Sequence, residues 1–74
     1  MSKKEDLTIL GDAIRLERLR RKWSQEQLAI QAGLSQSHHI SRIESGKTDL
    51  QTTTLFAILR ALDCKLEDLI DLKK

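Results

Sequence analysis

The sequence contains no proline and no tyrosine, and its 74 residues include only three glycines and one cysteine, Cys64. A lone cysteine excludes an internal disulfide, and the cysteine and histidines do not cluster at zinc-site spacing. The longest unbroken apolar run, residues 55–59, is far shorter than the ~20 residues of a membrane span. The N-terminus also lacks the apolar region of a signal peptide. We therefore expect a cytoplasmic protein with no metal, no cofactor and no membrane segment.

The apolar residues that are present recur at intervals of three and four, and no alternating pattern is sustained. This periodicity predicts an all-α fold, and the length allows a single domain. Residues 14–47 hold seven basic and three acidic residues, whereas the two flanking segments each carry a net charge of −1. The basic segment suits a polyanionic partner, although an ordinary solvated surface explains the charge equally well.

Residues 24–47 predict two short helices joined by a turn. Ser24 and Gln27 have the spacing of a capping box at the start of the first helix. Gly33 suits the left-handed residue that ends this helix. Trp23 lies just before the cap, where it can pack on the new helix and fix its angle to the preceding one.

The second helix of this stretch is expected over about residues 37–45. Ile40 and Ile43 are its only apolar residues and share one face, so hydrogen-bonding side chains cover the rest. We expect His39 to pack at the edge of the core and His38 to face DNA or solvent. Two helices joined in this way form a helix-turn-helix, whose second helix enters the DNA major groove.

A longer helix is expected from about Leu7 or Thr8 to Lys22, after a loose start at residues 1–6. Arg18 falls at the edge of its inward face and needs a partner. The inward face holds four apolar residues, Leu7, Leu10, Ala13 and Ile14. A second apolar ridge lies off this face, at Ile9, Leu16 and Leu19. The ridge either packs within the domain or contacts another protein.

Two further helices are expected in the C-terminal third of the chain. The first starts near residues 51–54 and provides much of the core through Leu55, Ile58, Leu59 and Leu62. The second spans about residues 66–72, where apolar residues are denser than a monomer of this size readily covers. We therefore interpret them as a homodimer surface, formed by Leu66, Leu69, Ile70 and Leu72.

Taken together, these segments resemble the Cro/C1-type, or Xre-like, helix-turn-helix family over about residues 10–70. The matching segments are Ile14-Arg15 with Arg18, residues 23–29 (WSQEQLA), 32–35 (AGLS), 40–47 (ISRIESGK) and 55–62. The resemblance implies a compact, five-helix, lambda-repressor-like domain with the helix-turn-helix at its second and third helices. It also implies that two-fold homodimers bind double-stranded operator DNA with palindromic half-sites.

The resemblance implies roles for particular residues as well. Gln25 would anchor a phosphate, while the start of the third helix and Arg42 would read base edges. Glu44 stands where the family places a glutamate that pairs with the position of Arg18. Lys47 follows the third helix and can reach backbone phosphate.

The third helix is where this chain departs from the family. Gly33 and Gly46 are 13 positions apart, one more than the usual family spacing. Either the turn has an extra residue or the first turn of the helix is irregular. Counting back from Ile40 gives base-facing positions at Ser37, His38, Ser41 and Arg42, with Gln36 at the cap. Counting forward from Gly33 gives Gln36 and Ser37 instead.

The sequence therefore predicts a homodimeric transcriptional regulator that binds DNA and represses its own or a neighbouring operon. We expect a bacterial or phage protein associated with the nucleoid. An enzyme is not expected, because no nucleophile has an evident activating base. The alternatives are a HipB-like antitoxin that also binds a toxin, a restriction-modification controller, a phage or plasmid repressor, and a protein-interaction module without DNA binding.

Overall fold

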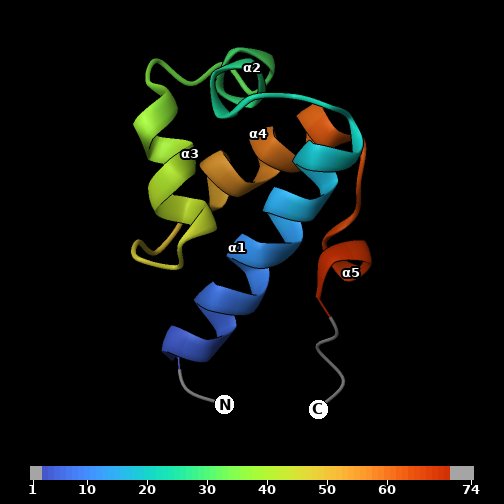
Figure 1. Cartoon of the computed structure of the whole chain (residues 1–74). Coiled ribbons are helices and arrows are strands. Elements are labelled where there is room, and N and C mark those ends of the chain that lie inside the picture. The colour runs from blue at the N-terminus through green and yellow to red at the C-terminus, as the bar shows by residue number, and fades with distance from the viewer. Residues whose placement is uncertain (1–2, 71–74) are drawn as a thin grey trace.

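The computed structural model describes residues 3–70, which form five helices and no strand (Figure 1). This result confirms the expected all-α, five-helix class. None of the described helices is long and apolar enough to cross a membrane. In chain order the helices are α1 (Lys3–Arg20), α2 (Gln25–Gln31), α3 (Ser37–Glu44), α4 (Thr52–Leu62) and α5 (Leu66–Leu69).

The first helix begins earlier than the sequence predicted. Residues 3–6 are helical, so the expected loose start is wrong for this part of the chain. Glu5 and Asp6 lie in the first turn of α1, where negative charge stabilises the positive end of a helix dipole. The chain leaves the helix after Arg20, and Lys22 adopts a left-handed conformation with φ 59°.

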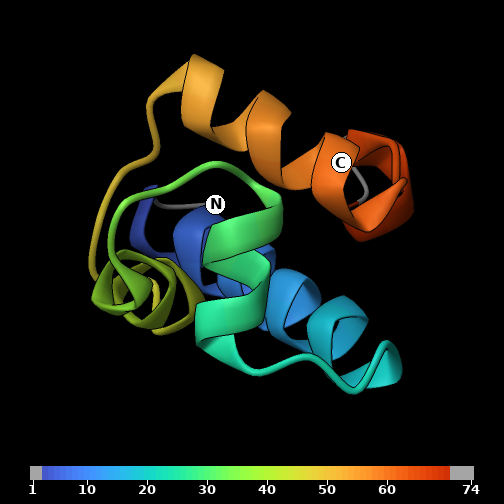
Figure 2. The same ribbon diagram turned by 90° about the horizontal axis from the view of Figure 1, so that it is seen from above.

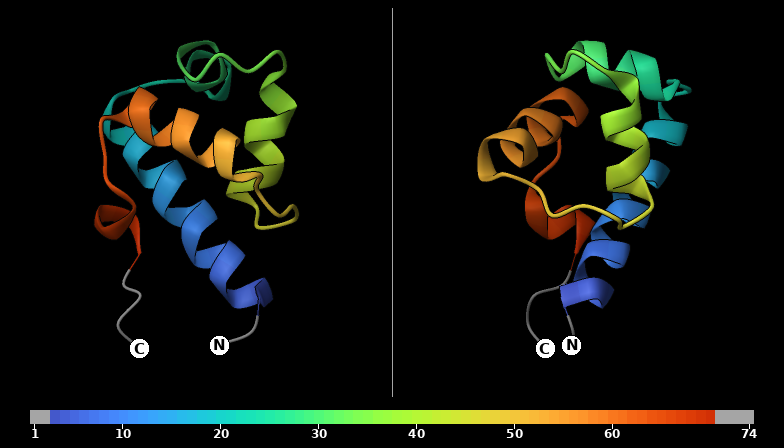
Figure 3. Two further views of the ribbon diagram at one scale, coloured as in Figure 1. Left: turned by 180° about the vertical axis from the view of Figure 1, so that it is seen from behind. Right: turned by 90° about the vertical axis from the view of Figure 1, so that its left-hand side faces the viewer.

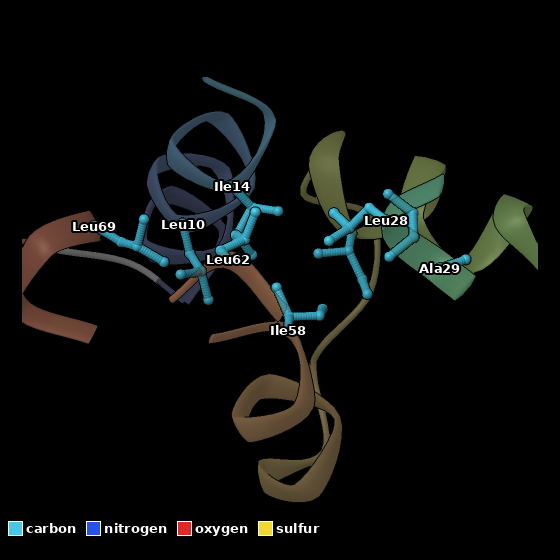
Figure 4. Close-up of a cluster of buried hydrophobic side chains, with 9 residues drawn as sticks. Leu10, Ile14, Leu28, Ala29, Ile58, Leu62 and Leu69 are labelled. Atoms are coloured by element: carbon cyan, nitrogen blue, oxygen red, sulfur yellow. The ribbon is translucent and has the colours of Figure 1, made fainter. Parts of the chain in front are cut away.

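The other helices are arranged around α1. α3 and α5 lie along different sides of it, and α2 packs on α3 (Figure 1). α4 crosses one further side of α1, as the view from above shows (Figure 2). Figure 4 shows Ile14 of α1 beside Leu62 of α4, with Ile58 and Leu28 further along the same cluster. The core residues are Leu10, Ile14, Leu28, Ala29, Ile40, Ile43, Ile58, Leu62 and Leu69.

The turns around α2 form as the sequence predicted. The Gln27 N–H donates to Oγ of Ser24 at 3.0 Å, and the Ser24 N–H donates to Oε1 of Gln27 at 2.7 Å. Gly33 has φ 74°, and the adjacent Leu34 N–H returns to the carbonyl of Ala29 at 2.8 Å. Half-buried Trp23 packs against the core. Local sequence chemistry therefore fixes both ends of α2.

The N-terminal half of α1 lies against the backbone at the end of α3. A Cβ atom placed on buried Gly11 would be 2.4 Å from the carbonyl oxygen of Ile43 and 2.7 Å from that of Glu44. Near the following turn, Gly46 has φ 73°, and a Cβ there would be 2.9 Å from Oγ1 of Thr8. The two backbones approach this closely only because these positions have no side chain.

The C-terminal ends of α1 and α4 are joined by Arg21. One guanidinium nitrogen donates to the carboxylate of Glu17 at 3.0 Å, and the other donates to the carbonyl of Leu62. This second nitrogen is also 3.7 Å from Sγ of Cys64. α4 ends at Asp63, which is left-handed with φ 55°. Arg21 therefore donates to a carbonyl at the end of α4, which also accepts from the thiol of Cys64 at 3.5 Å.

The last described helix is shorter than expected, and it changes the interpretation of its apolar residues. α5 ends at Leu69, whose side chain is buried in the core of the same chain. Leu69 therefore packs within its own chain, where α5 lies against α1, rather than on the exposed surface that we expected, and its part in a dimer stays a prediction. Leu66 and Ile70 are half-buried against the core, and Leu72 lies outside the described residues.

Candidate nucleic-acid interface

One face of α3 is anchored to the rest of the domain. Ile40 and Ile43 are buried between α3 and its neighbours, and Glu44 is buried beside them. Their spacing of three and four residues places all three on one side of the helix. This side includes the carbonyl oxygens that lie against Gly11. The position of the helix in the fold is therefore set by apolar contact, backbone contact and one buried carboxylate.

The buried carboxylate belongs to an ion pair. Nε of Arg18 donates to Oε2 of Glu44 at 2.7 Å, and Nη2 donates to Oε1 at 3.0 Å. The two residues are only 8% and 6% exposed. Nη1 of Arg18 donates to the carbonyl of Trp23 at 2.7 Å. The pair implied by the family resemblance is thus present, and its two parallel bonds fix α1 to α3 with defined geometry.

Gln25 joins the same cluster from the first turn of α2. Its Nε2 donates to Oε1 of Glu44 at 3.2 Å, and the side chain is half-buried. The carboxylate of Glu44 therefore accepts hydrogen bonds from both α1 and α2. This arrangement holds Gln25 at the edge of α3, near the surface where the resemblance implies a phosphate contact.

The opposite face of α3 is exposed and polar. His38, Ser41, Arg42 and Ser45 follow one another at the spacing of a single helical face, and all four are exposed. The view in the right panel of Figure 3 shows α3 with no other described segment in front of it. This face offers hydroxyl, imidazole and guanidinium groups, which can donate to or accept from base edges.

His39 is exposed as well, so its expected position at the core edge is wrong. It lies ~100° around the helix from Ile40. Ile40 and Ile43 already make the contact with α1 and α2, which leaves His39 on the flank. Its imidazole therefore points away from the buried cluster.

The segment in which this chain departs from the usual family spacing leads into a regular α3. α2 ends at Gln31, and α3 runs without interruption from Ser37 to Glu44, with exposed Gln36 as its extended N-cap. This register agrees with counting back from Ile40. Ser37 is half-buried, because its position is closer to the inner face than to the outer one.

A shallow cleft lies beside α3, with a volume of about 360 Å³. It is lined by Asp12, Arg15, Gln25, Ser41, Glu44 and Ser45. Sequence reasoning assigned no role to Arg15, which is exposed on α1. Arg15 stands four residues after Gly11 and three residues before Arg18, and both of those residues face α3. This position in the sequence was the signal that could have identified it. Exposed Lys47 follows α3, so Arg15, Arg42 and Lys47 are three basic groups around this helix.

The thiol of Cys64 lies elsewhere, beside Glu17 and Arg21. Burial raises the pKa of Cys64, and the nearby carboxylate of Glu17 raises it further. The thiol is therefore protonated near neutral pH, whereas a reactive cysteine needs a thiolate. The hydrogen bond to Glu17 is also the main reason that the pKa of Arg21 is raised. This cluster is a structural contact between the ends of α1 and α4.

The helix-turn-helix geometry is matched by a family model. The model, HTH_3, is described as helix-turn-helix and matches residues 14–69, from the middle of α1 to Leu69 at the end of α5. The chain belongs to the HTH_3 family. This HTH_3 protein is of the Cro/C1 type, whose members are DNA-binding transcription regulators.

A solved structure agrees with this assignment. The HTH_3 chain is similar to the restriction-modification controller protein C.AhdI from Aeromonas hydrophila, with a TM-score of 0.82 and 27% sequence identity. The similarity covers 89% of this chain and 98% of that one. No match was found among curated proteins.

Proposed function

We propose that this HTH_3 protein binds operator DNA as a homodimer and regulates transcription by placing α3 in the major groove. The single observation that carries the proposal is the contrast between the buried inner face of α3 and its exposed, fully polar outer face. Arg42 lies near the centre of the outer face, opposite Ile40. Bidentate pairing of arginine with guanine is the commonest specific base contact.

The residues around Arg42 have supporting roles in this proposal. His38 and Ser41 read neighbouring base edges, and Gln36 and Ser37 contact DNA at the start of α3. Gln25 and Lys47 bind backbone phosphates, and we add Arg15 because it lines the same cleft as Gln25. The cationic contacts from Lys47 and Arg15 neutralise phosphates and release counterions, so the affinity falls as salt is added.

The base contact is tested with DNA selected from a random duplex library, followed by fluorescence anisotropy on the selected duplex. We expect Arg42→Ala to weaken binding by ~1–3 kcal/mol and to relax the preference at one base pair. The matched control is Arg20→Ala, because Arg20 is also exposed but lies in the last turn of α1, outside the proposed DNA and dimer surfaces. Equal, sequence-specific binding by the Arg42 variant would reject the proposed role of α3.

The homodimer needs a surface other than buried Leu69. We propose the exposed side of α4, where Phe56 is 50% exposed beside half-buried Leu59. A cleft of about 360 Å³ lies there, and basic and acidic residues both line it: Arg60 and Lys65 with Asp63 and Asp68. A patch that carries both signs can complement itself across a two-fold axis. Leu66 of α5 and Ile70, which follows α5, lie at the edge of the core.

Sedimentation at micromolar concentration tests this surface. We expect the wild-type protein to be a dimer and Phe56→Lys to be a monomer, because a charge would replace the exposed apolar contact. The control is Ile30→Lys, which adds the same charge at an exposed apolar residue that lies on α2. A dimer that survives the Phe56 substitution would place the interface elsewhere.

Among the regulatory classes, the restriction-modification controller is favoured by the similarity to C.AhdI over nearly the whole of both chains. The alternatives are a repressor of phage or plasmid origin and a HipB-like antitoxin that represses its operon and binds a toxin. The adjacent gene distinguishes them. A methyltransferase gene supports the controller, a kinase-like toxin gene supports the antitoxin, and a phage module supports the phage repressor.

A further inference from the structure

The outer side of α1 carries apolar residues that neither the core nor the proposed DNA interface explains. Four residues, which we call the α1 stripe, follow one another at intervals of three, four and three: Ile9, Asp12, Leu16 and Leu19. This is the a/d spacing by which one helix packs along another. All four are exposed, and Ile9, Leu16 and Leu19 are 40%, 51% and 49% exposed. A helix face of this kind is suited to pairing with a second helix.

No other described segment covers the α1 stripe. α1 lies in front of α4 in Figure 1, and no ribbon crosses it on the side towards the viewer. The right panel of Figure 3 agrees, because α1 forms the edge of the molecule on the side away from α4. The inward positions of the same helix, such as Ile14, are fully buried. The stripe is therefore open to a partner along the length of α1.

The charges along α1 change sign near its middle. From residue 5 to residue 12 the charged residues are all acidic, and from residue 15 to residue 22 five of the six are basic. Exposed Asp12 and Arg15 stand on either side of the change, and neither has an ion-pair partner among the described residues. An antiparallel copy of α1 brings its basic half to the acidic half, so the helix complements itself. A parallel, in-register copy would place like charges together, which opposes association.

A two-fold axis near the middle of the stripe gives the register of such a pair. Ile9 of one copy then packs against Leu16 of the other on both sides of the axis. The two Asp12 carboxylates meet near the axis. The two Arg15 guanidinium groups, each about one helical turn away along α1, lie beside these carboxylates and balance their charge. The contact therefore buries apolar residues of both copies and joins each Asp12 to Arg15 of the other copy.

The size of this surface indicates weak pairing. A stable interface covers about 800 Å² of each partner, and three half-exposed aliphatic side chains with their flanking charges cover much less. We therefore expect the stripe to pair at protein concentrations of about 100 µM. This is well above the micromolar range in which the contact on α4 is tested.

Pairing through the stripe also covers the cleft beside α3. Asp12 and Arg15 both line this cleft together with Gln25, and the proposed function places a DNA phosphate there. Arg15 cannot pair with Asp12 of a second copy and with a phosphate at the same time. We propose that two copies of this chain pair antiparallel through the α1 stripe, and that this pairing and DNA binding exclude each other. The pairing rests on the stripe alone, whereas the exclusion rests on the proposed DNA contacts.

The pairing is tested with the full chain carrying Phe56→Lys, which removes the proposed contact on α4. We expect sedimentation equilibrium to show a monomer at micromolar concentration and a monomer–dimer equilibrium at about 100 µM. Leu16→Gln should weaken this equilibrium by at least about tenfold, because Leu16 packs against Ile9 of the other copy. Ile30→Gln is the matched control, since Ile30 is also an exposed apolar residue but lies on α2. A monomer at all concentrations, or pairing that Leu16→Gln leaves intact, would overturn the proposal.

The ion pair is tested by exchanging its two charges in the same background. Asp12→Arg and Arg15→Asp should each weaken the pairing by about tenfold, because like charges then face each other across the axis. The double variant should restore the pairing, since each arginine again faces an aspartate of the other copy. A double variant that pairs no better than the single variants would overturn the antiparallel register.

The exclusion is measured by NMR of the labelled full chain. The amide signals of α1 should shift as the protein concentration is raised, and this concentration dependence should disappear when the selected duplex is present in excess. Concentration-dependent shifts that persist with bound duplex would overturn the exclusion. A protein that binds no duplex would reject the proposed function, and the sedimentation results would still decide the pairing.

Discussion

The two faces of α3 show how one short helix can be both fixed and available. The inner face contains Ile40, Ile43 and Glu44, and each is buried in contacts with other helices. The outer face contains His38 and Arg42, which are exposed. Inner-face residues should therefore control whether α3 is in place, whereas outer-face residues should control only what it binds. The following substitutions test this division, from the largest expected loss of stability to the smallest.

Glu44→Ala should have the largest effect on folding. It leaves Arg18 buried without its carboxylate, and breaking one side of a buried pair costs ~3–5 kcal/mol. Urea unfolding followed by circular dichroism measures the loss. Glu26→Ala is the control, because Glu26 is exposed on α2 and a surface substitution changes stability by less than ~0.5 kcal/mol. Equal urea midpoints for the two variants would show that the ion pair of Arg18 and Glu44 does not anchor α3.

Gly11→Ala should have the next largest effect on folding. The added Cβ would lie 2.4 Å from the carbonyl of Ile43, so α1 and α3 must separate. Overpacking of this kind costs ~1–3 kcal/mol. We expect DNA affinity to fall together with unfolding stability, and a stable variant with unchanged affinity would contradict the importance of this backbone contact. Gly33→Ala provides a comparison, because its Cβ would meet no atom within 4 Å and only its positive φ is strained.

Gln25→Ala should lower the free energy of unfolding by less, because Glu44 keeps both hydrogen bonds from Arg18. Loss of one hydrogen bond to a charged group corresponds to ~1.5–3 kcal/mol when buried, and half-burial of Gln25 reduces this value. The same substitution should weaken DNA binding through loss of a neutral phosphate contact, with the salt dependence unchanged because glutamine neutralises no phosphate. Anisotropy at several salt concentrations measures the affinity and its slope. A change in stability without a change in affinity would mean that Gln25 only braces Glu44.

Arg42→Ala should have the smallest effect on folding. Its side chain is exposed, so the free energy of unfolding should change by less than ~0.5 kcal/mol, although the affinity for DNA falls. Urea unfolding of this variant, next to the anisotropy described above, completes the comparison. A clear destabilisation would show that the outer face also supports the fold.

Features that depend on neighbouring residues were predictable from the sequence. The capping box of Ser24 and Gln27 and the left-handed Gly33 follow from local backbone chemistry. The helical class follows from apolar spacing. The pairing of Arg18 with Glu44 spans 26 residues, so spacing alone could not identify the partner and the family resemblance was needed.

Features that depend on packing between distant segments were missed. Leu69 was assigned to a surface because the sequence does not show that α5 folds back onto α1. The helical start at Lys3 was missed because the apolar stripe begins only at Leu7, although Glu5 and Asp6 favour a helix N-terminus. The link between Gln25 and Glu44 requires two helices to cross, which is a property of the fold.

The close backbone contact at Gly11 also has a consequence for the DNA. A helix held by carbonyl contact and a buried ion pair has little freedom to tilt, so a docked duplex must supply most of the shape adjustment. Bending or compressing a duplex costs energy that depends on its base steps. We therefore expect operator preference to extend to base pairs that α3 does not touch, with flexible pyrimidine–purine steps favoured where the duplex must bend.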